Sequence, residues 1–146
     1  MIEVDVSTRG LEFDEVAEIL GKDLKRELVE RLAEVAYSEA FYGAPWKTGK
    51  LARSIVSEVD EDGEARIIAL APHAKFVIRG TAPHEIRPVN ASCLAFKAAG
   101  GDMIFTKLVR HPGTKPNPFL ERAVDKAQER VEELFDELFE EIIGLQ

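Results

Sequence analysis

Three prolines and one glycine fall within a ten-residue stretch, His111-Pro112-Gly113-Thr114-Lys115-Pro116-Asn117-Pro118-Phe119-Leu120, just before a long amphipathic segment. Proline fixes φ and glycine permits turn conformations, so the path of the backbone is restricted here. The stretch contains no nucleophile beside a base, no paired carboxylates and no glycine-rich phosphate loop. It is therefore predicted to orient a helix or to present a surface rather than to catalyse a reaction.

Apolar residues beyond this stretch recur at intervals of three and four, the period of a helix with one apolar face. Asn117 is predicted to cap the helix and Pro118 to occupy its first position. The apolar face comprises Phe119, Leu120, Ala123, Val124, Ala127, Val131, Leu134, Phe135, Leu138, Phe139, Ile142 and Ile143. A single helix reaching Ile143 would extend about 40 Å. A small sheet cannot cover this length, so part of the face is predicted to pack on another subunit.

A second long helix is predicted between Asp14, which is placed to cap it, and Tyr42, with Gly21 in its interior. The alternation of apolar and polar residues before it predicts a short strand at residues 2–6. The remaining predicted elements are an antiparallel pair at 53–59 and 65–71, a short helix or strand at 73–79, and a second antiparallel pair at 92–97 and 103–110. The chain is thus predicted to be one α+β domain, residues 1–146, with a small antiparallel sheet packed against two long helices.

The charge of the chain is unevenly distributed, although the formal total is -8. Residues 12–43 and 117–146 are acidic, whereas residues 44–116 are basic. A copy of the chain could therefore offer opposite charges to a neighbour, and solvated helix faces explain the same pattern. A surface this acidic argues against a DNA-binding protein that holds the phosphates tightly.

The single cysteine, Cys93, cannot form an internal disulfide and is predicted to pack in a strand that enters the core. A reducing compartment is therefore expected. The chain shows neither a signal-peptide pattern nor an apolar run of about 20 residues, so neither secretion by that route nor a membrane partner is predicted.

The candidate chemistry is sparse. His73, His84 and His111 lack close ligand spacing to one another, so no metal site and no cofactor are predicted. One alternative is a small hydrolase that uses His111 or His84 with a carboxylate, either Asp102 or Glu85. A second alternative is a nucleic-acid-binding module in the basic middle segment, which would use Lys47, Lys50, Arg53, Lys107, Arg110 and Lys115. Trp46 lies on a loop and is predicted either to plug the core or to anchor an interface.

Three blocks of sequence together resemble a known family. The first runs from Pro45 to Ile55 and holds Thr48-Gly49-Lys50-Leu51, the second runs from His73 to Thr81 and ends in Gly80-Thr81, and the third is the stretch from His111 to Leu120. In order and spacing, over about residues 10–130, they resemble the tail-component family of long-tailed double-stranded DNA phages. This family includes the gene-ten products of HK-type phages and is grouped with tail-completion and head-tail joining proteins.

The resemblance implies a structural virion protein without catalysis, located in the tail or neck of a virus or provirus and in the host cytoplasm during assembly. It implies a ring of identical subunits between a portal-side head-completion protein and tail-terminator or tail-tube proteins, through which DNA passes without specific binding. The segment from Thr81 to Asn90 is expected to face neighbouring copies or adjoining rings. The other residues expected at these contacts are Trp46, Lys47, Thr48, Gly49, Lys50, Gly80, Thr81, His111, Pro112, Gly113, Thr114, Lys115, Pro118 and Phe119.

Overall fold

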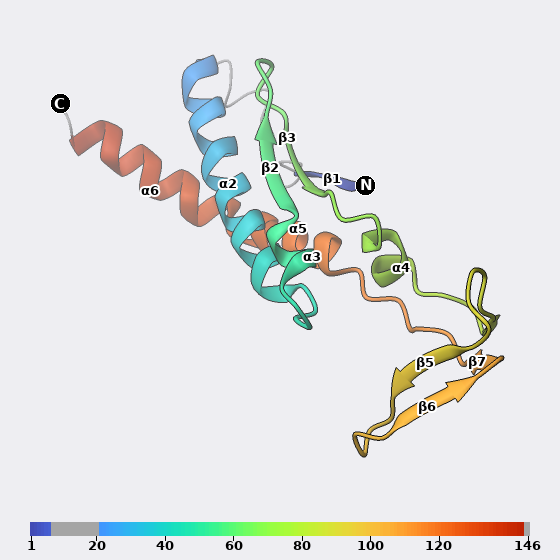
Figure 1. The fold of residues 1–146 in the computed structure, drawn as a ribbon. Helices are drawn as coiled ribbons and strands as arrows, with labels where there is room; N and C mark the ends of the chain where they lie inside the picture. Colours follow the sequence, from blue (N-terminus) through green and yellow to red (C-terminus); the bar gives the residue numbers. More distant parts are fainter. Residues whose placement is uncertain (7–20, 145–146) are drawn as a thin grey trace.

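The chain folds into a body of helices packed on a sheet and an arm of short strands that projects from it (Figure 1). The computed structural model describes residues 1–6 and 21–144. The elements of the body are β1 (Ile2–Val6), α2 (Lys22–Gly43), α3 (Lys50–Arg53), β2 (Ile55–Val59), β3 (Ala65–Ala69), α4 (Ala74–Arg79), α5 (Phe119–Glu129) and α6 (Val131–Gly144). The arm, residues 84–111, holds β4 (His84–Ile86), β5 (Leu94–Lys97), β6 (Met103–Thr106) and β7 (Val109–His111). The predicted α+β class is confirmed.

The sheet of the body is antiparallel, with β3 between β1 and β2. Ala69 is opposite Ile2 on one side and Ile55 on the other. The β2–β3 pair confirms the predicted hairpin, but its first strand begins at Ile55 and not at Arg53. Residues 50–53 form the helical turn α3 instead, in which the Arg53 backbone N–H donates to the Gly49 carbonyl at 3.0 Å.

The core lies between this sheet and the helices α2 and α5. α2 buries a stripe at helical spacing, because Leu28, Leu32 and Ala36 are each almost fully excluded from solvent. Gly21 was predicted inside this helix, but it lies at the N-cap with φ of 83°, a left-handed conformation that a helix interior cannot contain. The predicted cap at Asp14 lies outside the described residues.

The predicted single C-terminal helix is broken into α5 and α6 at Arg130. There the Arg130 backbone N–H bonds to the Ala127 carbonyl, a tighter turn than the α-helical pattern. After the break, Val131, Leu134 and Leu138 are buried, so the change of direction keeps α6 against the body. The prediction of one rod of about 40 Å was therefore wrong. The sequence contains no sign of the break, because the apolar stripe continues without interruption through the tight turn.

The start of α5 also differs by one residue from the prediction. Pro118 is at the N-cap and Phe119 is the first helical residue. No side chain caps this helix, and the Asn117 side-chain oxygen instead accepts a hydrogen bond from Arg122 at 2.5 Å. The prediction of an Asn117 cap was therefore wrong.

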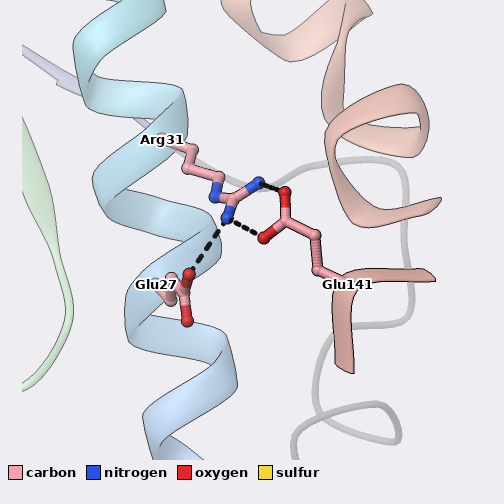
Figure 2. A network of polar contacts seen from close by, with 3 residues as sticks. All are labelled: Glu27, Arg31 and Glu141. Atoms are coloured by element: carbon pink, nitrogen blue, oxygen red, sulfur yellow. Dashed lines mark hydrogen bonds and ion pairs between the residues drawn. The ribbon is translucent and has the colours of Figure 1, made fainter. Parts of the chain in front are cut away.

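An ion-pair network fastens α6 to α2 (Figure 2). Two guanidinium nitrogens of Arg31 donate to the two carboxylate oxygens of Glu141, at 3.1 and 2.6 Å. The nitrogen at 2.6 Å also donates to Glu27 on α2 at 3.1 Å. These bonds raise the pKa of Arg31, and the hydrogen bond from Arg31 lowers the pKa of Glu141 below its ordinary value of 4.5.

Glu141→Gln is expected to lower the unfolding temperature at neutral pH and to leave it unchanged at strongly acid pH. A carboxyl whose folded-state pKa is lowered stabilises the fold above its ordinary pKa, and this contribution disappears as the pH falls through the folded value. Thermal unfolding of both proteins at pH 7 and below pH 3 measures the difference. Glu140→Gln, an exposed neighbour on α6, is the matched control. A constant difference at all pH values would contradict the assigned pair.

Candidate assembly surfaces

The arm is joined to the body by a stalk, residues 80–83 and 112–116, that brings the second and third sequence blocks together. The Thr81 backbone N–H donates to the Thr114 carbonyl at 2.9 Å, and the Thr114 N–H donates to the Thr81 carbonyl at 3.0 Å. At the base of the stalk the Asn117 N–H donates to the Val77 carbonyl of α4 at 3.0 Å. Two segments about thirty residues apart in sequence are thus held in fixed register.

Two glycines make the close approach of the two stalk segments possible. Gly80 and Gly113 have φ values of 71° and 86°, which residues with a Cβ rarely adopt. A Cβ on Gly80 would also collide with the Thr114 carbonyl oxygen, and a Cβ on Gly113 with the Thr81 carbonyl oxygen. Gly-Thr in one block and Pro-Gly-Thr in the other are therefore explained by the packing of one backbone on the other.

The arm consists of two antiparallel pairs, β4 with β7 next to the stalk and β5 with β6 farther out. No residue of segment 82–110 is buried. Its large exposed apolar side chains are Ile86, Val89, Phe96, Met103, Ile104 and Phe105. An isolated two-stranded hairpin is marginally stable in water, and apolar groups gathered on a surface are typical of contact sites. The arm therefore has the composition of a contact surface.

Two strand predictions in the arm need correction. Residues 103–110 were predicted as one strand, but β6 ends at Thr106 and β7 begins at Val109, where the chain turns to pair with β4. The Thr106 hydroxyl bonds to the Leu108 carbonyl and thereby fixes this bend. Cys93 was predicted to pack in a strand that enters the core, but it precedes β5 and is only half-buried. It belongs to the arm, where no residue of segment 82–110 is buried.

An aromatic patch, formed by Tyr37, Phe41, Tyr42 and Trp46, covers the C-terminal end of α2. The Trp46 side chain is 60% exposed, so it does not plug the core. Its ring lies 6.0 Å from that of Phe41, and the guanidinium of Arg53 lies 5.8 Å from it. Exposed aromatic rings beside arginine are typical of the residues that dominate binding energy at interfaces.

A single glycine holds the Trp46 indole in this position. Gly49 has φ of 75°, and a Cβ there would approach the indole to 2.8 Å. This explains the Thr-Gly pair of the first block, because any other residue would displace the ring.

The predicted interface residues divide between two places in the structure. Trp46, Lys47, Thr48, Gly49 and Lys50 form the loop beside the aromatic patch, whereas Gly80, Thr81 and residues 111–115 belong to the stalk and the end of the arm. Phe119 differs from both groups, because its side chain is 1% exposed and fills the core of the protomer. The basic residues of the nucleic-acid alternative are divided in the same way. Three lie in or next to α3, namely Lys47, Lys50 and Arg53, and three lie on the arm and stalk, namely Lys107, Arg110 and Lys115.

The structure brings His84 and His111 together, although they are distant in sequence. Their rings stack with centroids 4.9 Å apart. The Nδ1 of His111 accepts a hydrogen bond from the Gly113 N–H, and the Nδ1 of His84 lies 2.9 Å from the Ala82 carbonyl. Glu85 bonds to Arg87 and also lies 3.8 Å from Arg110. The pair thus has a structural role at the end of the stalk, and the hydrolase alternative gains no nucleophile from it.

The described residues contain no group of three or more histidine, cysteine or acidic side chains placed to hold a metal ion. Within the same residues, no helix is long and apolar enough to span a bilayer.

The sequence analysis missed three of the four aromatic residues of the patch and the exposed apolar character of the arm. Tyr37 and Tyr42 lie in the helical pattern of α2 and differ from core residues only by their exposure, while Phe41 is partly buried against the core. In the arm, β5 and β6 are apolar on both faces, a pattern equally typical of buried strands. Glycine and proline at both ends of the segment are the signal that separates it from the core.

Comparison with known protein families gives a match over part of the chain. Residues 11–80 match the family model described as Bacteriophage HK97-gp10, putative tail-component. No curated protein and no solved structure matches the chain. The matched residues include α2, α3, the β2–β3 hairpin and α4, and they end at Gly80 where the stalk begins. The first block and most of the second lie within them, while the third block lies outside. Residues 11–80, just under half of the chain, are thus similar to a putative tail-component family of phages, a similarity that supports a structural phage protein.

Proposed function

We propose that this protein is a ring subunit that completes the tail or joins it to the head, and that it acts without catalysis. The observation that carries the proposal is the arm, which exposes six large apolar side chains on a stalk of fixed geometry. Such a surface suits permanent contact with other protein surfaces. The family match supports a tail component, and the aromatic patch supplies a second contact surface on the body.

The expected neighbours are further copies of the chain, a portal-side head-completion protein, and tail-terminator or tail-tube proteins. DNA passes through the ring without specific binding in this proposal. Acidic helices favour passage, because each phosphate held by a basic side chain would resist sliding. The α6 segment from Val131 to Gly144 carries six acidic residues and no basic one.

Deletion of the gene in the virus or provirus that encodes it tests the proposal. We expect filled heads and separate tails in electron micrographs, with joined particles restored when the wild-type gene is supplied in trans. Purified protein mixed with portal and tail-tube proteins should bind one of the two. Normal yields of joined, infectious particles without the protein would exclude the proposed role.

A further inference from the structure

We infer that the arm of one copy packs into a groove between α2 and β2 of the next copy, so that the ring closes by head-to-tail contacts. The inference rests on the proposed ring function and names the surfaces that hold the ring together. Three observations carry it: the arm lacks a core, an apolar groove lies open on the body, and the two surfaces carry opposite charge.

The first observation is the energetic state of the arm. Phe96 and Ile104 face each other across the β5–β6 pair and are 41% and 39% exposed, while Phe105 on the other face is 66% exposed. The contacts within a two-stranded hairpin do not by themselves offset the conformational entropy that is lost when the chain is ordered. Burial against another surface would remove these apolar groups from water at about 25 cal/mol per Å².

The second observation is a groove of about 480 Å³ between α2 and the edge strand β2. Its apolar floor is formed by Ala33, Tyr37 and Val59. A second hollow of about 460 Å³ shares Ser57 and Val59 with it, so the two depressions are continuous along β2. As an edge strand, β2 presents one row of backbone donors and acceptors that lies outside the sheet.

The third observation is the charge of the two surfaces. The acidic residues that line the hollows are Glu30, Glu34, Glu58, Asp60 and Glu64. The two arginines beside them are already paired, Arg26 with Glu30 and Arg66 with Asp5 and Glu64. Glu34 and Glu58 have no such pair among the described residues, so the groove is negative.

The arm carries the opposite charge. It holds four basic residues and two acidic ones, and its acidic Glu85 is matched by Arg87 and Arg110. Lys97, at the end of β5, and Lys107, between β6 and β7, have no acidic partner among the residues that the structure describes. Complementary potentials of this kind select a partner and fix its register.

The arm does not reach the groove of its own copy. Figure 1 shows the arm extending from the end of the body near α4, whereas the groove runs along α2 from Arg26 to Tyr37 and along β2. The stalk hydrogen bonds hold the arm in that direction. A contact between two different surfaces repeats from copy to copy and closes into a ring when the rotation permits.

Charge reversal with rescue tests the contact in the full chain. Lys97→Glu with Lys107→Glu in the arm, or Glu34→Lys with Glu58→Lys in the groove, should each raise the self-association Kd about tenfold or more. The four substitutions combined should restore most of the affinity. Sedimentation velocity gives the Kd, and circular dichroism checks the fold. The matched controls are Lys22→Glu with Lys75→Glu and Glu129→Lys with Glu140→Lys, which lie outside both surfaces and should leave the Kd unchanged.

A mixing experiment distinguishes arm-in-groove contacts from other symmetric arrangements. The groove-reversed protein keeps the basic arm that fits the acidic groove of the arm-reversed protein, and the reversed arm of the second protein fits the reversed groove of the first. Native mass spectrometry of the mixture should therefore show mixed oligomers in which the two proteins alternate, whereas neither protein alone should form them. Arm-to-arm contact predicts instead that groove reversal has no effect, and this result would overturn the inference.

A wild-type chain that stays monomeric at about 1 mM, a concentration that detects even weak contacts, would also overturn it. The inference would also be overturned if the protein with all four substitutions did not recover its self-association affinity. The gene-deletion result is independent of these outcomes. Suppose that the deletion strain yields unjoined particles but neither charge reversal changes the self-association Kd. The ring role would then stand, and the arm-in-groove contact would be excluded.

Discussion

Phe119→Ala is expected to lower the free energy of unfolding by about 3–5 kcal/mol. The Phe119 side chain is 1% exposed and is among the largest fully buried side chains of the described core, at the first turn of α5. Its truncation removes the transfer free energy of the ring and leaves a cavity that the surrounding helices fill only in part. Urea unfolding followed by circular dichroism, with unchanged m-value, measures the loss.

Phe105→Ala is the matched control, since it removes the same ring from a site that is 66% exposed in the arm. Its effect on the stability of the monomer should stay within about 0.5 kcal/mol. Equal effects of the two substitutions would mean that Phe119 is not a core residue. A large effect of Phe105→Ala alone would mean that the arm packs on the body of its own copy.

Gly113→Ala is expected to disrupt the stalk and to leave the body folded. The new Cβ would require a left-handed backbone and would overlap the Thr81 carbonyl oxygen, at a local cost of about 1–3 kcal/mol or more. Hydrogen exchange of the Thr81 and Thr114 amides should accelerate roughly ten- to hundredfold, since 1.4 kcal/mol is a tenfold change in the opening equilibrium. The unfolding temperature of the body should hardly change, because the stalk contributes no buried residue to its core.

Gly63→Ala separates backbone strain from steric overlap. Gly63 has φ of 79°, close to that of Gly113, but a Cβ there would meet nothing within 4 Å. It should cost about 1 kcal/mol, without effect on exchange at Thr81 or Thr114. If Gly113→Ala left the exchange of both amides at the wild-type rate, the stalk would not depend on that close approach.

The sequence predicted the body better than the arm, for a physical reason. Helical spacing in α2 and α5 and the turn between β2 and β3 are local signals, and the structure confirms the elements that they predict. The break at Arg130 was invisible because the apolar stripe continues from Ala127 to Val131 across it. The boundary between Thr106 and Val109 was missed because it depends on pairing with β4, which lies more than twenty residues earlier.

The candidate site was predicted in part and for an incomplete reason. The glycines of the three blocks were expected at contacts with neighbouring copies or adjoining rings, whereas Gly80 and Gly113 permit one backbone to pack on another within the protomer. The contact between the second and third blocks is long-range, so spacing alone gave no indication of it. Phe119 was expected at an interface because it belongs to the third block of the family resemblance, yet its side chain is buried in the first turn of α5.

The antiparallel pairing of the stalk also determines how far the β5–β6 tip stands from the helices. Each added residue in a strand would lengthen the reach by about 3.4 Å, and successive side chains point to opposite faces. Inserting two residues on each side of the Thr81–Thr114 bridge would therefore extend the hairpin by about 7 Å with the same orientation. Inserting one on each side would turn it over. Paired, even-numbered insertions at this one position would thus change the reach of the arm without changing the face that it presents.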